Sequence, residues 1–532
     1  MRKCPTKFIN LIALVFVLFL QFACSKDSDL FAEYILDESV NPIENISNEE
    51  EEQQPDPDDE TIIDVQLGEL KAFPTAYGGG SNASGGRGKI LAIITSLNRN
   101  EALTYHAASG NQDEYYTGGL FTAMQNKNVG YIIFNVSGNI QLGVGGTGAQ
   151  YGFSGMPGVN NKTIFGQSAP EGGITLTGGT FRLDGSDGDN QNLIFRYLRS
   201  RPIINRDGAL TTEDDAYTWS FLFYGGNDII VDHCSTSFAQ DKAIGGFISK
   251  NTERLENITF SNNLICDSGT GAYTAINPGR DGNPENNVDY ISYNQNVIVS
   301  VNRTPNLAFN GNAEKINNIL HNIPGKQTSA YHALQLNEIG NYYRGSESKN
   351  KIREDISAVS GMPLIYTKDN YFEGVLTGKS SENNSQIWTL HDGTTLAETS
   401  YFQSNAFSGF PNPITSITPQ KAFTNLVTNG DVGAYKYFNN DGIVKVFRDS
   451  FDTSQLSIVE NNQNYTSQVV SNWILPTIPN NNRPESYDTD NDGMADAWEM
   501  QQFGDLKQSY RGDYNGDGYE NIEEYMSQVD FQ

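Results

Sequence analysis

The feature that most constrains the fold is a short apolar segment that recurs along the middle of the chain. Its copies begin at Asn192, Asn227, Asn257, Asp289 and Lys315. The interval is roughly 25 to 35 residues, and no helical period intervenes. Such a repeat indicates a solenoid in which each coil buries its apolar face against the next. Asparagines at matching places would then stack and hydrogen-bond from coil to coil.

Three similar runs extend this character toward the N-terminus. They cover 90–94, 131–136 and 163–165, and glycine-rich turns separate them. Short β-branched runs bounded by glycine predict strands, so residues 65–475 are expected to form one all-β domain. The alternative that this pattern leaves open is a β-sandwich with asparagine-rich turns.

The first residues have the pattern of an export signal. Three basic residues precede an apolar run from 9 to 22, which is short for a membrane span. The run ends in Ala23-Cys24, which resembles the lipobox of bacterial lipoproteins. We therefore expect residues 1–23 to be a signal peptide and Cys24 to carry a lipid anchor in the outer membrane, with the protein facing the cell surface. An ordinary secretory signal with a chance cysteine is the alternative.

Acidic residues dominate the chain, whose formal net charge is −29. This charge argues against nucleic acid as a partner, because phosphate binding needs clustered Lys and Arg. Residues 24–64 are especially rich in Asp, Glu, Asn, Ser and Pro, and include four consecutive glutamates at 49–52. Such a segment buries too little apolar surface to offset its ordering entropy, so we expect an extended, disordered tether.

Only two cysteines remain once the signal is removed and Cys24 is lipidated. These are Cys234 and Cys266, and each lies in a predicted strand. We expect both to be buried free thiols in the stack of coils. A disulfide in an oxidising compartment is the alternative.

An ordered set of motifs resembles the pectate lyases of polysaccharide lyase family 1. The set comprises 72–74 (Ala-Phe-Pro), 85–88 (Gly-Gly-Arg-Gly), 134–140, 163–170, 229–235, 433–434 and 447–449. The resemblance runs in this order from about residue 70 to about residue 470. It implies a right-handed parallel β-helix, an acidic polysaccharide as the substrate and Ca2+ as the cofactor.

The resemblance also implies a mechanism. Pectate lyases cleave by β-elimination: a base takes the proton α to a uronate carboxylate, and the 4-linked oxygen leaves. Calcium and arginine neutralise the carboxylate as charge develops. The family's base is an arginine in an Arg-x-Pro motif, and Arg303-Thr304-Pro305 stands where that motif is expected. Arg303 is therefore the candidate catalytic base, and a surface arginine before a turn proline is the alternative.

The family's calcium cradle uses acidic residues on neighbouring coils. The resemblance implies that Asp214, Asp215 and Asp241 supply these carboxylates here. Oxygen ligands of this kind suit calcium, which bridges the protein to the substrate's carboxylates. Solvated loop aspartates are the alternative interpretation.

Three charges of the family pattern are absent. Ala308 stands where a second arginine is expected, and Gly245 stands in place of an acidic residue. The lysine of the following coil has no clear match around 267–269. Lys242 is an additional basic residue that would replace a metal charge and bind the substrate.

The C-terminal region repeats a calcium-loop motif twice, within residues 484–530. The motif places oxygen-bearing side chains at positions 1, 3, 5, 9 and 12 and glycine at position 6, so that the carboxylates converge on one ion. The first loop has Asp488, Asp490, Asp492, Asp496 and Glu499 as ligands. The second has Asp513, Asn515, Asp517, Asn521 and Glu524. The pair resembles EF-hand-like and dockerin-like modules, and a structural clamp is favoured over a sensor.

We therefore expect a monomeric, surface-anchored lyase that cleaves a pectate-like uronic-acid polymer. One alternative is a carbohydrate-binding β-helix without catalysis, which the absent charges favour. The other is a β-helix glycoside hydrolase, whose chemistry needs two or three carboxylates around the scissile bond. Residues 345–415 carry no motif that indicates a role.

Overall fold

The structure is a computed structural model. It describes residues 70–142, 159–184, 190–203, 219–239, 242–248, 253–266, 273–276, 287–301, 303–345, 350–353, 361–373, 385–392, 400–465 and 473–532. The chain divides into two compact units, Met1–Asp64 and Val65–Gln532, and all described residues belong to the second. The predicted signal, Cys24 and the tether lie outside the described residues. No helix among the described residues is long and apolar enough to cross a membrane.

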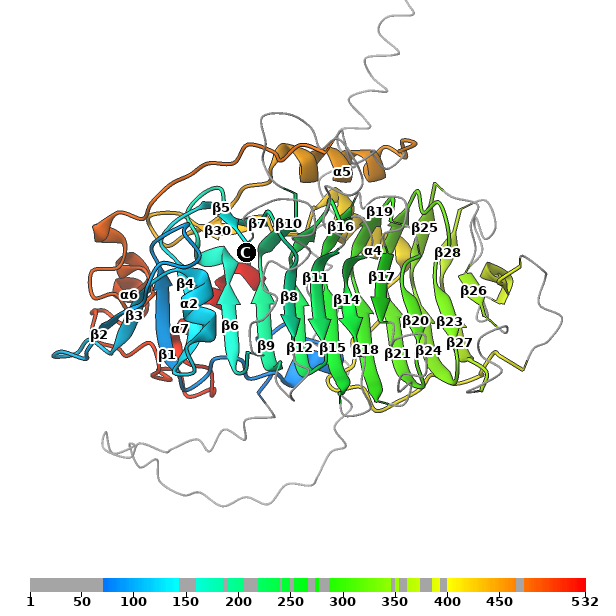
Figure 1. Ribbon diagram of the computed structural model, residues 1–532, viewed down its shortest axis with the longest axis horizontal. Coiled ribbons are helices and arrows are strands. Elements are labelled where there is room, and N and C mark those ends of the chain that lie inside the picture. Colours follow the sequence, from blue (N-terminus) through cyan, green and yellow to red (C-terminus); the bar gives the residue numbers. More distant parts are fainter. Residues whose placement is uncertain are drawn as a thin grey trace, which may run out of the picture. The chain divides into compact units, whose positions relative to one another are not determined.

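Within the described residues, three long sheets share one core (Figure 1). From residue 181 onward, the chain adds one strand in turn to an eight-stranded, a twelve-stranded and a nine-stranded sheet. Strands of successive coils pair in parallel, except for β2 and β3. The protein is a parallel β-helix, which confirms the predicted solenoid and excludes the β-sandwich.

The three long sheets have the following strand orders. The twelve-stranded sheet has the order β2 (Thr104–His106), β3 (Tyr115–Gly118), β1 (Ile90–Ile94), β4 (Val129–Phe134), β6 (Lys162–Phe165), β9 (Gln191–Arg196), β12 (Gly226–Asp232), β15 (Leu255–Ser261), β18 (Val288–Asn294), β21 (Gly311–Ile316), β24 (Leu334–Ile339) and β27 (Leu364–Lys368). The nine-stranded sheet has the order β28 (Tyr371–Phe372), β25 (Tyr342–Arg344), β22 (Ile319–His321), β19 (Val297–Val299), β16 (Leu264–Cys266), β13 (Ser235–Thr236), β10 (Leu198–Arg201), β7 (Ile174–Thr177) and β5 (Gly138–Gln141). The eight-stranded sheet has the order β29 (Trp388–Leu390), β26 (Asn350–Ile352), β23 (Ser329–Tyr331), β20 (Asn306–Ala308), β17 (Tyr273–Ile276), β14 (Lys242–Phe247), β11 (Trp219–Tyr224) and β8 (Phe181–Asp184).

The five copies of the sequence repeat form β9, β12, β15, β18 and β21, which are neighbours in the twelve-stranded sheet. Alternate side chains of these strands, such as Ile229, Ile258 and Ile291, point into the shared core and are fully buried. They also pair in register from strand to strand, so like residues stack on like. One interval of the sequence repeat therefore corresponds to one coil of the solenoid.

A ladder of buried asparagines marks the corner between the twelve-stranded and nine-stranded sheets. Its members are Asn263, Asn296, Asn318, Asn341 and Asn370, and the side-chain oxygen of each of the last four accepts from the preceding one. These oxygens also accept from backbone N–H groups of the preceding coil, which leaves the buried corner fully paired. The ladder steps are 33, 22, 23 and 29 residues, so some coils are shorter than the repeat suggested.

Helices lie outside the coils. The described ones are α2 (Leu120–Gln125), α4 (Pro419–Phe423), α5 (Ser450–Glu460), α6 (Asp496–Gln502) and α7 (Asn521–Met526). A separate antiparallel hairpin consists of β30 (Lys436–Phe438) and β31 (Val444–Val446). Asp449 caps the N-terminus of helix α5, and its side chain accepts from two backbone N–H groups. Its Leu456 and Val459 pack on the outer side of the nine-stranded sheet, and α6 and α7 lie beside β1 (Figure 1).

The cysteines and the Asp232-His233 pair have structural environments. Cys234 and Cys266 are buried free thiols, as predicted, and burial raises the pKa of Cys234 to about 12. His233 is buried, with Nδ1 2.7 Å from the Asp232 carboxylate. The guanidinium of Arg196 donates to the same carboxylate. The histidine thus hydrogen-bonds within the stack of coils.

Candidate active-site face and calcium loops

The eight-stranded sheet contains the described candidates for catalysis. Arg303 is half-buried and lies just before β20, near the middle of this sheet. The backbone around it is attached to the next coil, because Thr304 N–H donates to the Gln327 carbonyl and Ser329 N–H donates to the Pro305 carbonyl. The Arg-x-Pro segment is thereby held at a fixed place in the sheet.

Lys242 begins β14 in the same sheet, two strands from β8 and two strands from β20. It pairs in register with Trp219 of β11 and Tyr273 of β17, and its side chain is buried. Sequence reasoning assigned Arg303 and Lys242 to one site. The structure places them on strands that share one sheet.

Asp214, Asp215 and Asp241 lie outside the described residues. The calcium cradle that the family resemblance implies therefore stays a prediction. Two of the three absent charges fall at described positions: Gly245 lies in β14, and Ala308 lies in β20, where it pairs with Tyr331 of β23. The third, around 267–269, lies outside the described residues.

Two cation–aromatic pairs lie on this sheet on either side of β20. On β8 and β11, the Arg182 guanidinium lies 3.9 Å from the centre of the Tyr224 ring, which in turn contacts Phe247 of β14 at 5.0 Å between centroids. Beyond β20, the Arg353 guanidinium lies 5.3 Å from the ring centre of Tyr331.

Strand alternation explains why these side chains face outward. Their neighbours Phe181, Leu183, Ala330 and Ile352 belong to the central core cluster, whereas the two arginines and their tyrosines do not. The Tyr331 hydroxyl also donates to the Asn306 side chain of β20 at 2.7 Å. Arginine and aromatic groups on such a face can bind carboxylates and stack on sugar rings.

Sequence reasoning missed these four residues. A signal was present, because each arginine stands next to a core residue in a short strand of the solenoid. Ala308, which stands where an arginine is expected, pairs with Tyr331 on the next strand. The same register continues toward Arg353, two strands from Ala308. Strands lie about 4.8 Å apart, so this cation stands about 10 Å from the expected place.

The first calcium loop brings its predicted carboxylates together beside β1. Ligand oxygens of Asp488, Asp490 and Asp496 lie within 4.8 Å of one another, and so do those of Asp490, Asp492 and Glu499. The side chain of Asp488 accepts from the backbone N–H groups of the turn, which fixes the loop geometry. All five predicted ligands of this loop therefore converge.

The same loop holds carboxylate oxygens that have no hydrogen-bond partner. Both oxygens of Glu499 are buried and unpartnered, as is one oxygen each of Asp490 and Asp492. Burial and the neighbouring carboxylates raise the pKa of Asp488 to about 8 and that of Glu499 to about 9. A crowded set of oxygen donors with unmet bonding capacity fits a hard divalent cation such as Ca2+.

The second loop is more exposed and satisfies its polar groups internally. Asp513 accepts from the backbone N–H groups of Gly516, Asp517 and Gly518, and the Asn515 amide donates to Glu524 at 3.1 Å. At position 9, the Asn521 side chain accepts from Tyr514 N–H and donates to the Ser509 carbonyl. Burial and Asp517 raise the pKa of Glu524 to about 7.

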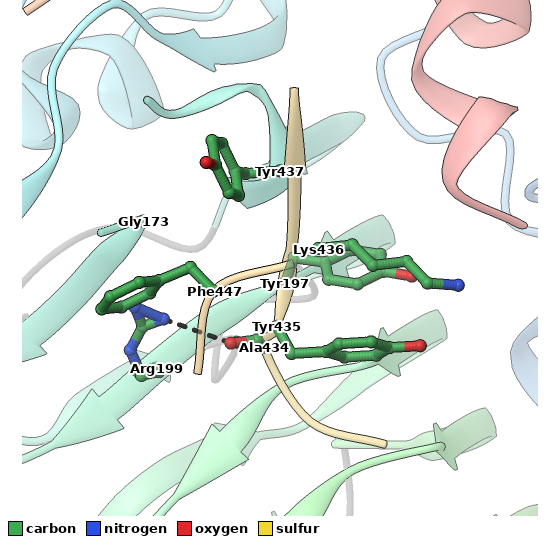
Figure 2. A pocket seen from close by; sticks show the side chains of 9 residues that line it. Gly173, Tyr197, Arg199, Ala434, Tyr435, Lys436, Tyr437 and Phe447 are labelled. Carbon is green, nitrogen blue, oxygen red and sulfur yellow. Dashed lines mark hydrogen bonds between the residues drawn. The ribbon is translucent and has the colours of Figure 1, made fainter. Parts of the chain in front are cut away.

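A small cavity lies between the nine-stranded sheet and the hairpin of β30 and β31. Figure 2 shows Arg199, Tyr197, Tyr435 and Phe447 around it, with Arg199 donating to the Ala434 carbonyl at 3.2 Å. Its volume is about 10 Å³, which suffices for about one water molecule. This cavity is a packing feature, since a sugar cannot enter it.

Taken together, the fold and its outer face define a parallel β-helix with a cationic and aromatic strip on one sheet. No family model matches the chain. The chain is 26% identical over 457 residues to the probable pectate lyase C of Aspergillus fumigatus, covering 81% of this chain and 87% of that protein. It is also 26% identical over 405 residues to the probable pectate lyase C of Aspergillus terreus, covering 74% and 77%.

The chain also matches solved pectate lyases along most of their length. One is the pectate lyase of Paenibacillus sp. 0602, with a TM-score of 0.42, 11% identity, and coverage of 69% of this chain and 96% of that one. Another is a pectate lyase bound to a hexasaccharide, with a TM-score of 0.39, 14% identity, and coverage of 70% and 99%.

Proposed function

We propose that this protein is a polysaccharide lyase that cleaves a pectate-like uronic-acid polymer by β-elimination. The observation that carries the proposal is the position of Arg303 at the entry to β20, between the two cation–aromatic pairs of the eight-stranded sheet. Similarity to proteins named probable pectate lyase, along most of both chains, supports the same activity.

The residues of the sheet have separate roles in this reaction. Arg303 accepts the proton α to the uronate carboxylate, and a dry, electropositive surrounding is what lets a guanidine act as a base. Lys242 donates to the carboxylate and offsets the charge that develops on it. Arg182 and Arg353 bind carboxylates of neighbouring sugars and so orient the chain across Arg303.

Calcium belongs to this proposal in two places. Bound at the predicted cradle of Asp214, Asp215 and Asp241, it would neutralise the substrate carboxylate and acidify the adjacent proton. Asp488, Asp490, Asp492, Asp496 and Glu499 would hold a second ion in the first C-terminal loop, and Asp513, Asn515, Asp517, Asn521 and Glu524 a third.

The activity assay follows the absorbance of unsaturated uronate products released from polygalacturonate. The wild type should produce them, and Arg303→Ala should not. Products without the unsaturated end would favour the glycoside hydrolase. Binding of the polymer without any depolymerisation would identify the non-catalytic binding protein. Full activity of Arg303→Ala would refute the assignment of the base.

We further propose that the mature protein is anchored by lipid on Cys24 at the bacterial outer membrane. The apolar run that ends in Ala23-Cys24 and the acidic stretch after it support this proposal. Expression with a labelled fatty acid should label the wild type but not Cys24→Ser. Release of the unlabelled wild type into the medium would contradict it.

A further inference from the structure

The C-terminal segment 484–530, which we name the calcium module, packs on the outer side of the first strands of the twelve-stranded sheet. One buried apolar cluster joins the two parts. From the sheet it contains Leu91, Ile93, Tyr131, Ile133 and Phe165, and from the module Met494, Ala495, Ile522, Tyr525, Met526 and Val529. The module is therefore built into the fold and covers an apolar face that would otherwise be exposed.

The first calcium loop itself makes this contact. Gly493 occupies position 6 of the loop with a φ of 91°, and a Cβ there would meet Leu91 and Ile133 at 3.1 and 3.0 Å. The next residues, Met494 and Ala495, are fully buried against the sheet. The loop that gathers the carboxylates is thus the same loop that inserts between the module and the sheet.

This arrangement places unpaired acidic groups against an apolar surface. Glu499 has no exposed surface, and neither of its carboxylate oxygens has a hydrogen-bond partner. Asp492 is nearly as buried, and one of its oxygens is also unpartnered. Burying carboxylates in this way is costly unless a cation binds them. Opening the loop would relieve the repulsion, but it would also withdraw Gly493 and Met494 from the sheet.

Polar contacts connect the rest of the module to the N-terminal part of the chain. The Arg87 guanidinium pairs with Glu523 at 2.9 Å, across 436 positions of sequence. Glu520 accepts from the Tyr131 hydroxyl at 2.6 Å and from Gly88 N–H at 3.0 Å.

The turn of the β2–β3 hairpin contacts the first calcium loop and a residue that precedes the second. The Gln112 side chain donates to the Asp490 carbonyl of the first loop. Arg511, just before the second loop, pairs with Glu114 at 3.0 Å. Edge strand β2 and the first coils are therefore held by a segment from the opposite end of the sequence.

We propose that a divalent cation in the first calcium loop acts as a clasp that locks the calcium module onto the first coils of the β-helix. Cation binding and docking are coupled, because the loop can bury its carboxylates only when an ion balances them. Binding to the docked state alone then stabilises the fold by mass action. The second loop also contacts the first coils, through Glu520, Ile522 and Glu523. Its ligand side chains leave no buried oxygen without a partner, so an ion there does not control docking. This role is independent of lyase activity.

The test uses the mature protein with Glu499→Gln and its matched control Glu524→Gln, which removes the same charge from position 12 of the second loop. Ca2+ added after chelation should raise the Tm of the wild type by several degrees. Glu524→Gln should keep most of this response, and Glu499→Gln should lose it. Terbium luminescence sensitised by Trp498, next to Glu499, should report direct occupancy of the first loop.

Limited proteolysis provides a second measurement. Chelation of the wild type should make a C-terminal fragment removable by protease while the remaining β-helix resists. This result needs no variant, so a misfolded Glu499→Gln protein would leave the proposal testable. A wild-type Tm and proteolysis pattern that do not respond to Ca2+ would overturn it. An equal calcium response in the two variants would also overturn it.

Discussion

The two outer faces of this solenoid differ although one alternation rule builds both. On the eight-stranded sheet, the residues that alternate with the core include Arg182, Tyr224, Tyr331 and Arg353. On the first strands of the twelve-stranded sheet they are apolar, and the chain's own C-terminal segment covers them. The inward residues of both sheets belong to one core cluster.

Substrate binding and stability are therefore expected to depend on different faces of the solenoid. A β-helix obtains its stability from the core and from covered apolar outer faces, so a face of cationic and aromatic groups is available to hold catalytic side chains. Changes on the eight-stranded sheet should alter catalysis with little effect on unfolding. Changes on the covered face should do the reverse. Each of the following predictions tests one side of this separation.

The largest effect is expected for Arg303→Lys. Lysine keeps the positive charge but lacks the planar guanidinium and its fixed geometry. If Arg303 is the base, kcat on polygalacturonate should fall by about 10²- to 10⁴-fold, while the Tm stays within about 1 °C of the wild type, because only a half-buried side chain changes.

Arg182→Lys is the control for this substitution, because it makes the same exchange elsewhere on the sheet. It should change KM with little effect on kcat. A similar fall in kcat in both variants would remove the special role of Arg303. A loss of Tm together with kcat would mean that the two faces are not separable.

The covered face is tested by Ile133→Ala in β4. Ile133 is 2% exposed and packs against the calcium module. Its truncation should lower the free energy of unfolding by about 2–5 kcal/mol. Denaturant unfolding measures the change, and kcat at 20 °C or below should stay near the wild-type value.

Ile443→Ala removes the same atoms from a residue that is 48% exposed. Its free energy of unfolding should change by less than about 0.5 kcal/mol. Equal destabilisation by the two substitutions would show that the covered face contributes nothing specific to stability.

The sequence predicted the fold well because the deciding signals are local or periodic. Apolar alternation and coil-length spacing identify β9, β12, β15, β18 and β21 without knowledge of any distant contact. The first calcium loop is likewise contained within twelve consecutive residues, and its five ligands converge as expected. The second loop and the cradle at 214, 215 and 241 remain predictions.

The position of the calcium module could not be predicted in this way, because Arg87 and Glu523 stand 436 positions apart. An indirect signal did exist. The runs 90–94 and 131–136 are apolar without alternation, which is typical of strands that are buried on both faces. The two arginines that accompany Arg303 were missed for another reason. Arg182 and Arg353 follow no motif, and only the alternation in short strands places them on the outer face.

A smaller effect on stability is expected from pH. Asp232 at 2.7 Å and Asp431 at 3.5 Å outweigh burial and raise the pKa of His233 to about 9. The unfolded pKa is about 6.5, so the protonated histidine stabilises the fold fully below that pH. This contribution is lost as pH rises through 9. Between pH 6.5 and 9.5, the wild type should lose about 1–3 kcal/mol more stability than His233→Gln.

The groups around His233 allow a graded test of this pH dependence. Arg196, Tyr197 and Tyr435 also face the imidazole or its partners. Asp431→Asn should shift the loss of stability to lower pH, because it removes one of the two carboxylates. An identical stability–pH profile for the wild type and His233→Gln would refute the assignment.

The smallest effect is expected for Arg353→Gln, and it tests whether the outer strip binds the polymer beyond the reacting sugar. Arg353 lies two strands past Ala308, about 10 Å away, so it would bind a uronate that is distant from the scissile bond. A partly solvated charge of this kind contributes modestly, and KM for long polygalacturonate should rise roughly 3- to 10-fold at unchanged kcat. On digalacturonate, which has no uronate beyond the two that flank the scissile bond, the variant should equal the wild type. Arg254→Gln, whose side chain is 70% exposed beside β15, is the control and should change neither constant. Equal effects of Arg353→Gln on both substrates would place its role at the reacting sugar instead, and no effect on either would confine binding to the surroundings of Arg303.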